Sequence, residues 1–444
     1  MRKKIILFLI IAMIAGSGQA FAQLANGNYI GASGNFSFMP LELQLVHEPA
    51  AGRDRENDLK AAQGQWWGGT YGRLVLFFRG QHNFIGYEAQ FLTDDGILQL
   101  DLANAWVKPF DWMKLTIGRF ADATLRGRVL PNEFHYTVLR AWSRTANLDA
   151  QDVIFNFNSS VTGGAQLALT PIYNLYIGLT LPGVFSGFPV DSTSQVPGGE
   201  TAKNIYSNIQ AAAGYTLDGI GLIRAQYVGK PEFEITRTMA ESMYLGQRYS
   251  QPVYTDLPRF ELAFAYTGLD DMVIDLGFKF APPPMSNFTL TGGGGTLKTT
   301  YNPGYVFGLG LRMNMGNFAL IFNGSGHFGN SYKAEAAAVT NEYSYGMNMN
   351  FHLMPQYNLG FGFVGMNLGI DITGKEKING TDVAGTGRTD FGIGAWFSKH
   401  LAPGCAFWAG LSYTYKGVEG YGARQPDQPS GYIRIPIIIQ AWFF

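Results

Sequence analysis

Apolar and polar residues alternate along much of this chain, and no other feature of the sequence constrains its fold as strongly. From Tyr305 to Asn314 every odd-numbered residue is large and apolar, whereas the even-numbered residues are mostly glycine or polar. Because side chains on a β-strand point alternately to its two faces, this pattern predicts a strand with one apolar and one polar face. Residues 343–352 and 407–416 repeat it. We therefore expect an all-β protein.

The composition agrees with strands that meet either a membrane or a packed core. The chain has 57 glycines, 33 phenylalanines and 23 tyrosines, and only 15% of its residues are charged. After Ala22 it has no run of the roughly 20 consecutive apolar residues that a membrane helix needs. A helical membrane protein is therefore excluded. A soluble β-sandwich would show the same alternation, so the two ends of the chain and its loops must distinguish the remaining classes.

The first 22 residues have the features of a secretory signal peptide. Basic residues at positions 2–4 precede an apolar run over residues 5–15, and the small-residue pattern Ala20-Phe21-Ala22 follows. The apolar run is too short to span a membrane comfortably as a helix. We expect residues 1–22 to be removed after export, leaving residues 23–444 as the mature chain.

The last fourteen residues, Gly431 to Phe444, form a second informative segment because they have the pattern of an aromatic-rich strand. A final strand of this kind is common in outer-membrane barrels, where it pairs with the first strand and removes both edges of the sheet. One face of the segment carries isoleucines at positions 433, 435, 437 and 439, whereas the face of Phe444 also carries Arg434 and Gln440. The alternation leaves open which of these two faces meets lipid.

Eighteen segments predict an antiparallel transmembrane β-barrel of about eighteen strands, with sixteen strands as the alternative. Short turns, such as Asp218-Gly219, Met315-Gly316 and Pro355-Gln356, alternate with mostly long polar loops, as in outer-membrane barrels. The apolar phase changes after Phe38, so Met39-Pro40 predicts a β-bulge. The expected strands are residues 27–48, 68–79, 83–92, 96–107, 111–119, 160–169, 173–181, 205–216, 220–228, 259–268, 272–281, 304–315, 317–326, 341–353, 357–373, 388–399, 404–416 and 430–444.

Through its aromatic C-terminus, its alternating strands and its plan of loops, the sequence resembles the general diffusion porins of Gram-negative outer membranes over essentially the whole mature chain. The resemblance implies a passive channel in the cell outer membrane, through which small hydrophilic solutes and ions diffuse along a charged lumen. It also implies contact with outer-membrane lipids, recognition of the strand ending at Phe444 by the barrel-assembly machinery, and assembly as a homotrimer.

The longest early loop, residues 120–151, carries four arginines together with acidic residues and a histidine. In porins such a loop often folds inward and narrows the channel, and the resemblance implies the same role here. Charged residues in the polar phase of nearby strands would add a positive field and an acidic partner to the constriction. The alternative is an outward, solvated loop with self-paired charges. The expected pore-lining and constriction residues are Arg73, Arg79, Glu88, Asp101, Arg126, Arg128, Arg140, Arg144 and Arg224.

Charge and ligand-forming residues argue against several other kinds of site. The mature chain has 29 basic and 33 acidic side chains, which gives no global attraction to nucleic acid. A single cysteine, Cys405, excludes an internal disulfide and a multi-cysteine zinc site. The six histidines form no close ligand pair. We therefore expect no metal, no cofactor and no nucleic-acid partner.

Two motifs suggest catalysis, but the sequence around each of them does not support a catalytic site. The glycines of residues 360–365 have the spacing of a dinucleotide-binding loop, but β alternation continues through them and no helix follows. Ser325 and His327 are the nearest match to a barrel phospholipase, and nothing identifies a third, orienting residue. We therefore expect that the protein is not an enzyme.

Two other functions remain open on the sequence. A plugged barrel that transports hydrophobic ligands such as fatty acids is favoured by apolar loop residues such as Met239, Met243 and Tyr244, although residues 23–26 leave little chain for an N-terminal plug. An adhesin-type surface barrel is favoured by the long loop over residues 229–258. Ion conductance distinguishes a channel from both.

Overall fold

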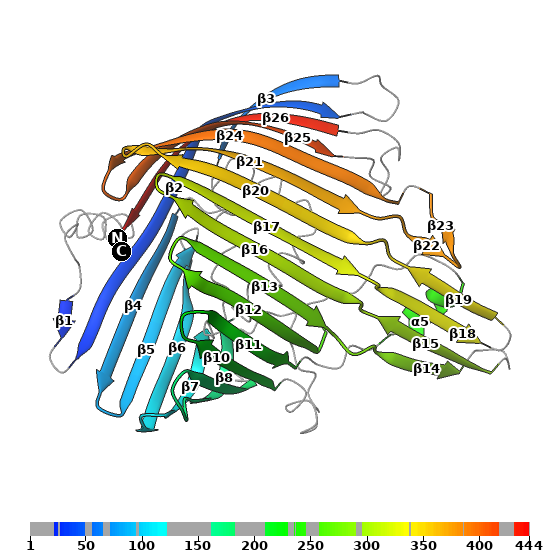
Figure 1. The fold of residues 1–444 in the computed structure, drawn as a ribbon, viewed down its shortest axis with the longest axis horizontal. Helices are drawn as coiled ribbons and strands as arrows, with labels where there is room; N and C mark the ends of the chain where they lie inside the picture. Colours follow the sequence, from blue (N-terminus) through cyan, green and yellow to red (C-terminus); the bar gives the residue numbers. More distant parts are fainter. Residues whose placement is uncertain are drawn as a thin grey trace.

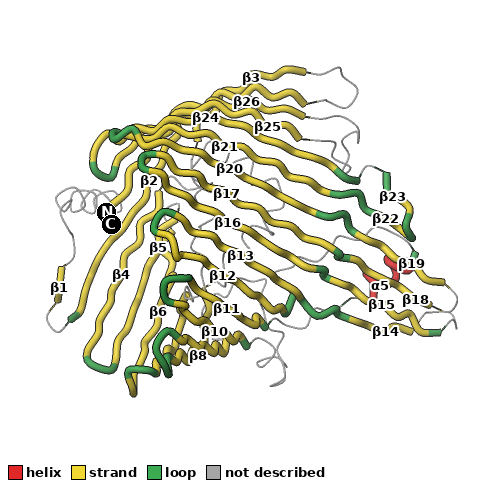
Figure 2. Tube along the Cα trace, in the orientation of Figure 1, coloured by secondary structure: helices red, strands yellow, loops and turns green. Residues whose placement is uncertain are grey.

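The computed structural model describes residues 22–24, 27–48, 56–64, 72–94, 97–121, 161–182, 209–229, 235, 237–245, 257–289, 295–336, 339–384, 386–416 and 430–443. Most of these residues lie in β-strands, which form two sheets (Figures 1 and 2). The one helix among them is α5 (Arg237–Tyr244). Within the described part of the chain, no helix has the length and apolar character needed to cross a membrane.

The main sheet contains twenty strands, and all its pairings are antiparallel. Figure 1 shows it curling from β4 through β13 to β26. The strands are β1 (Ala22–Leu24), β2 (Asn28–Glu48), β3 (Glu56–Gly64), β4 (Gly72–His82), β5 (Ile85–Asp94), β6 (Ile97–Phe110), β7 (Met113–Ala121), β8 (Val161–Leu169), β9 (Leu175–Pro182), β10 (Gln210–Leu217), β11 (Gly221–Val228), β12 (Arg259–Leu269), β13 (Met272–Phe280), β16 (Tyr305–Met315), β17 (Phe318–Phe328), β20 (Asn348–Asn358), β21 (Gly362–Thr373), β24 (Arg388–Ala402), β25 (Cys405–Lys416) and β26 (Ser430–Phe443).

Eighteen of these strands pair in a continuous cycle. Each strand from β4 to β13 pairs with the next, and the succession continues through β16, β17, β20, β21, β24, β25 and β26. β26 then pairs with β2 within residues 34–47, and β2 pairs with β4 over residues 28–36. Residues 34–36 therefore have partners on both sides. The cycle confirms the predicted number of strands, and every predicted segment overlaps one of them.

A bulge divides β2 into two parts with different neighbours on one edge. β4 pairs with residues 28–36, whereas β3 pairs within residues 39–48, so β3 and β4 follow one another along β2. The register shifts between Phe38 and Leu41 on the β26 side, which confirms the bulge predicted at Met39-Pro40. Proline lacks the N–H that a regular ladder needs, so the pairing is irregular there. The sequence pattern did not predict β3, whose alternation is weak.

The two faces of the main sheet differ as the alternation predicts. On β16, Tyr305 is 56% exposed and its neighbour Val306 only 2%. The face with exposed apolar side chains is called the outer face and the opposite one the inner face. On β26, Ile435 and Ile439 are exposed while Ile438 is buried, so the isoleucine phase is the outer one. This settles the phase that the sequence left open; Phe444 lies outside the described residues.

A second sheet of six strands continues the wall beyond β12–β24 (Figure 1). It lies at the end of the strands away from the short turns, because β14 and β15 connect β13 to β16, and β18 and β19 connect β17 to β20. Its strands were not predicted as separate elements. They are β14 (Met285–Thr289), β15 (Thr296–Asn302), β18 (Ser331–Ala336), β19 (Val339–Ser344), β22 (Lys377–Ile378) and β23 (Thr381–Asp382).

In the second sheet the polarity of the two faces is reversed. Leu297 and Tyr301 are fully buried, whereas Lys298, between them, is exposed. Helix α5 packs on the buried face and contributes Met239 and Met243 to a core that also contains Val306 of the main sheet. The helix therefore lies on the inner side of the wall. An outer face that carries lysine is suited to water rather than to lipid.

The core of this region is rich in stacked tyrosines. The rings of Tyr332 and Tyr343 lie 4.9 Å apart at 9°, and Tyr343 donates a hydrogen bond from its hydroxyl to Glu376. Burial raises the pKa of Tyr301 and that of Tyr345 above the ordinary value. Both phenols are therefore neutral in the physiological pH range.

Two sequence expectations about this region were wrong. The segment 341–353 was predicted as one strand with Tyr343 on its apolar outer face, but Tyr343 is 2% exposed and faces inward, whereas Phe351 is 36% exposed and faces outward. The phase changes because β19 and β20 are separate strands. A turn was predicted at Pro355-Gln356, but β20 continues to Asn358. The β20–β21 pairing is interrupted between Leu353 and Gln356, which accommodates the missing N–H of Pro355.

The short turns gather at one end of the main sheet (Figure 2). Between β16 and β17, Gly316 has φ +62°, a conformation that glycine adopts without the strain that a Cβ would bring. The turns predicted at Asp218-Gly219 and Met315-Gly316 are confirmed. The expected signal peptide falls almost wholly on residues 1–21, and these lie outside the described part of the chain.

Replacement of Leu411 by arginine tests whether the outer face meets lipid. Leu411 is 54% exposed near the middle of β25. We expect Leu411→Arg to lower the free energy of unfolding from lipid vesicles by about 2–4 kcal/mol, because a charge on the lipid face must enter hydrocarbon. Urea titration monitored by tryptophan fluorescence measures the change. Leu411→Phe is the matched control and should change little; equal stability of both variants would contradict a lipid-facing position.

Candidate functional site: the charged inner face

The inner face of the main sheet carries most of the buried polar side chains. On a strand the side chains at i and i+2 share a face, so Arg224 and Gln226 of β11 point inward together, as do Arg259 and Glu261 of β12. The strand pattern thus concentrates charge on one side of the sheet. The buried polar residues of this face are Thr116, Thr180, Arg224, Gln226, Arg259, Glu261, Asp275, Lys279, Asn323, Ser325, His327, Asn350, His352, Asn367, Asp371, Asp390, Ser398 and Ser412.

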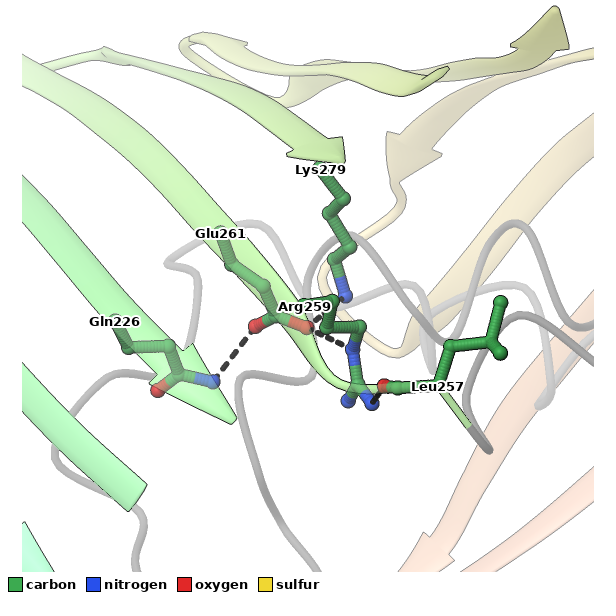
Figure 3. Close-up of polar contacts among 5 residues, drawn as sticks. All are labelled: Gln226, Leu257, Arg259, Glu261 and Lys279. Carbon is green, nitrogen blue, oxygen red and sulfur yellow. Dashed lines mark hydrogen bonds and ion pairs between the residues drawn. The ribbon is translucent and has the colours of Figure 1, made fainter. Parts of the chain in front are cut away.

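Three neighbouring strands form a buried cluster around Glu261 (Figure 3). In the register of the sheet, Glu261 of β12 lies opposite both Gln226 of β11 and Lys279 of β13. Its Oε2 accepts a hydrogen bond from Gln226 Nε2 at 2.6 Å, and its Oε1 accepts one from Arg259 Nε at 2.6 Å. Lys279 Nζ lies 2.9 Å from the same Oε1. We call these four residues the Glu261 cluster.

The Glu261 cluster brings two cations to one carboxylate. Glu261 and Lys279 are fully buried, and Arg259 is 6% exposed. Arg259 also donates from Nη1 to the carbonyl of Leu257, two residues earlier in the chain, at 3.4 Å. A buried carboxylate is stable only when it is paired and hydrogen-bonded. Glu261 therefore links β11, β12 and β13 on the inner face.

A second buried ion pair lies on the same strands, closer to the short turns. Arg224 Nη2 is 3.9 Å from Asp275 Oδ1, and both side chains are at most 2% exposed. Arg224 is one of the residues predicted to line the pore; the structure places its side chain on the inner face, where it is 1% exposed. The structure adds the carboxylate of Asp275 beside it, which offsets its charge locally.

Arg79 and Glu88, also predicted as pore-lining, are direct partners across β4 and β5. Arg79 Nη2 lies 2.7 Å from Glu88 Oε1, and Arg79 Nε donates to the same oxygen at 2.8 Å. The side chain of Arg79 is 54% exposed and that of Glu88 25%. The guanidinium also lies over the ring of Phe77, with 4.8 Å between Cζ and the ring centroid. This pair is far more accessible than the Glu261 cluster.

The remaining predicted site residues are described only in part or not at all. The backbone of Arg73 pairs with Asp94 on β5, and Asp101 is the extra residue of a register shift in β6; their side chains lie outside the described residues. Arg126, Arg128, Arg140 and Arg144 also lie outside the described part, as does loop 120–151 beyond Ala121.

Sequence reasoning missed several inner-face residues that the structure brings together. Arg259 was overlooked, although it stands two residues before Glu261 in the same phase. Trp106 and Lys108 of β6 were also overlooked. The ammonium groups of Lys108 and Lys114 each lie 5.1 Å from the centroid of the Trp106 ring. The signal for this grouping was the short turn at residues 111–112, which places β6 and β7 side by side.

Aromatic side chains border the apolar outer face at both ends. Near the short turns, Phe84, Tyr173 and the stacked pair Phe110 and Trp112 are exposed; the last two rings lie 5.2 Å apart at 3°. At the other end, Tyr227, Phe260 and Phe280 form a chain of ring contacts of 5.0 and 5.1 Å. Rings at two levels with an apolar band between them are typical of the two interfaces of a membrane.

The side chains that suggested catalysis have other partners. Ser325 donates from Oγ to Asn350 Oδ1 at 2.7 Å, and His327 Nε2 lies 2.6 Å from the carbonyl oxygen of Pro303. The hydroxyl of Ser325 is therefore directed to an amide and not to an imidazole. Within the described ranges, no group of three or more histidine, cysteine or acidic residues has the geometry to hold a metal ion.

Comparison with known proteins gives likeness of fold alone. No family profile and no curated protein matches the sequence. Among solved structures, the chain is similar to the outer-membrane channel DcaP of Acinetobacter baumannii, with 9% identity, a TM-score of 0.46, and coverage of 96% of this chain and 100% of that one. It is similar to OmpT of Vibrio cholerae, with 10% identity, a TM-score of 0.44, and coverage of 95% and 99%. It is also similar to an anion-selective porin from Comamonas acidovorans, with 12% identity, a TM-score of 0.42, and coverage of 93% and 100%.

The pairing and the two faces define the class of protein. Eighteen antiparallel strands pair in a cycle, their outer face is an apolar band between two aromatic levels, and their inner face is charged. This is the architecture of a transmembrane β-barrel of the outer-membrane type.

Removal of the Glu261 carboxylate tests its role in the wall. We expect Glu261→Gln to lower the free energy of unfolding by about 3–5 kcal/mol, because Arg259 and Lys279 lose their shared counter-charge in a buried site. Chemical denaturation of the folded protein in detergent measures the loss. Glu335→Gln, in the exposed pair with Lys333 on the second sheet, is the matched control and should lower the free energy of unfolding far less, because water screens an exposed ion pair. Equal losses in the two variants would contradict the assignment.

Proposed function

We propose that this protein is a passive outer-membrane channel through which small hydrophilic solutes and ions diffuse. The observation that carries the proposal is the division of charge between the two faces of one sheet. Apolar side chains occupy the outer face, and charged and amide side chains occupy the inner face of the same strands. A wall of this kind keeps water and polar solutes on one side and lipid on the other.

Accessible charge on the inner face supports a conducting path. Arg79, Glu88, Lys108 and Lys114 have partly or largely exposed side chains near the short turns. Fixed charges along such a path sort ions by sign and orient polar solutes. Nothing in this mechanism needs a reaction, so the proposed function is transport without catalysis.

We propose in addition that loop 120–151 forms the constriction and that its arginines favour anions. The sequence supports this by placing four arginines, Arg126, Arg128, Arg140 and Arg144, in one loop. Recognition of the C-terminal strand by the barrel-assembly machinery is part of the same proposal, and so is assembly of the channel as a homotrimer.

A transporter for hydrophobic ligands is the alternative that the sequence left open, and the described inner face does not favour it. Ile321, Met354 and Trp396 form an apolar cluster on the inner face, but they are at most 5% exposed and offer no surface to a ligand. The loop methionines that first suggested such a function do not support it. Met239 and Met243 are at most 5% exposed within the core around α5, so they offer no surface to a ligand.

Single-channel recording in a planar bilayer tests the channel. We expect steady openings whose current rises linearly with voltage, and a reversal potential under a salt gradient that indicates anion preference. Folding is checked beforehand by heat-dependent mobility on gels. A folded barrel without conductance would overturn the proposal and favour the hydrophobic-ligand transporter or a surface adhesin.

Neutralisation of the four loop arginines tests the constriction. We expect glutamine at positions 126, 128, 140 and 144 to shift the reversal potential towards cation preference, because the positive field at the narrowest point is removed. Lys298→Gln, on the exposed outer face of the second sheet, is the control for a change in net charge alone. Unchanged selectivity in the loop variant, or an equal shift per charge in the control, would contradict a constriction role.

A further inference from the structure

Two lysines of the inner wall share one tryptophan ring. Lys108 and Lys114 belong to adjacent strands, β6 and β7, and Nζ of each lies 5.1 Å from the centroid of the Trp106 ring. The two ammonium groups are therefore within about 10 Å of each other. We call these three residues the Trp106 patch. It lies beside the short turn of residues 111–112, at the same end of the wall as Arg79.

A glycine fixes the orientation of the ring. Gly86 of β5 lies opposite Trp106 in the register of the sheet. A Cβ atom at Gly86 would stand 2.2 Å from Cζ2 of Trp106, so the indole lies across the glycine backbone. The ring thus lies along the wall, and the lysine stems of two strands reach it.

Acidic side chains compensate the charge of the patch only in part. The carboxylate of Glu88, on the adjoining strand, acts electrostatically on Lys114, but it is paired with Arg79 at 2.7 Å. Among the residues that the structure describes, neither Lys108 nor Lys114 forms an ion pair. They differ in this from Arg224, Arg259 and Lys279 of the inner wall, each of which has an acidic partner. Cation–π contact with a shared ring holds two like charges together but does not neutralise them.

We propose that the Trp106 patch is a binding subsite for a compact divalent oxyanion, of the chemical class of phosphate. This proposal rests on the proposed channel function, because the anion reaches the patch through the lumen. Two ammonium groups on flexible stems can both approach one divalent anion, which neutralises both of their charges. A monovalent anion neutralises only one of the two charges, so it binds less favourably. Lysine is a common partner of phosphate oxygens and binds them as a point charge. A channel with such a subsite briefly retains phosphate-class anions at the short-turn end of the lumen.

The test is the conductance of the membrane-reconstituted protein in potassium chloride, titrated with potassium phosphate at pH 8 and constant ionic strength. We expect phosphate to reduce the chloride current along a saturable curve, and nitrate, as a monovalent control, to give no saturable reduction. Replacing both lysines, Lys108→Gln with Lys114→Gln, should raise the half-saturating phosphate concentration by about fivefold or more.

Two matched variants separate the subsite from a general effect of charge or folding. Lys108→Arg with Lys114→Arg retains both charges and should retain the phosphate effect. Lys399→Gln removes one lysine from the same end of the wall, at an exposed position in the phase opposite to Trp396, and should leave the phosphate effect unchanged. Equal half-saturation in the double glutamine variant and the unmodified protein would overturn the proposal, as would a saturable effect of nitrate of the same size.

Calorimetric titration of the detergent-solubilised protein with potassium phosphate makes the outcome independent of conductance. Binding that the double glutamine variant loses supports the subsite even in a protein that does not conduct. Normal conductance without phosphate binding or current reduction would overturn the subsite and leave the proposed channel intact. Absence of conductance together with intact phosphate binding would overturn only the channel.

Discussion

Every backbone amide of a strand that crosses a lipid bilayer must find its hydrogen-bond partner within the protein, and the rest of this structure depends on that constraint. A sheet satisfies it when each strand has a neighbour on both sides, and here the neighbours form a cycle from β4 to β26 and back through β2. Lipid then meets one face of every strand. The other face is free to carry the side chains that lipid would not admit, which is why the charges of this chain collect on one side of its sheet.

The sequence predicts the strands well because their signal is physical and local. Where lipid and water lie on opposite faces, each position must be apolar or polar in turn, so Leu411 and Ser412 already indicate their faces. In the second sheet, outside the apolar band, the same alternation rule predicts the wrong face. Tyr343 is apolar and continues the pattern of Phe351, but it lies in the core beneath α5, where the apolar side of the wall is the inner one. Alternation alone gives the period of a strand and not the medium that each face meets.

The candidate site is predictable to a smaller extent. The position of a residue in the alternation gives the face of the sheet on which its side chain lies, but not the side chains of other strands beside it. Arg224 is placed inward by its phase, but the carboxylate beside it comes from β13, 51 positions away in a different hairpin. Arg259, Glu261 and Lys279 depend in the same way on the register of three strands. The Trp106 patch was within reach of sequence reasoning, because one short turn joins its two strands. It was missed because an aromatic residue in the polar phase breaks the simple rule.

Two glycines in neighbouring connections meet at the point where the wall changes its polarity. A Cβ atom at Gly346 would stand 1.8 Å from the carbonyl oxygen of Gly374, and the N–H of Gly374 bonds to the carbonyl of Met347 at 2.6 Å. This contact lies between β19 and β20 on one side and between β21 and β22 on the other. No residue with a side chain fits at Gly346 without separating the two segments. The two glycines therefore keep these two connections in contact at the level where the main sheet ends and the second sheet begins.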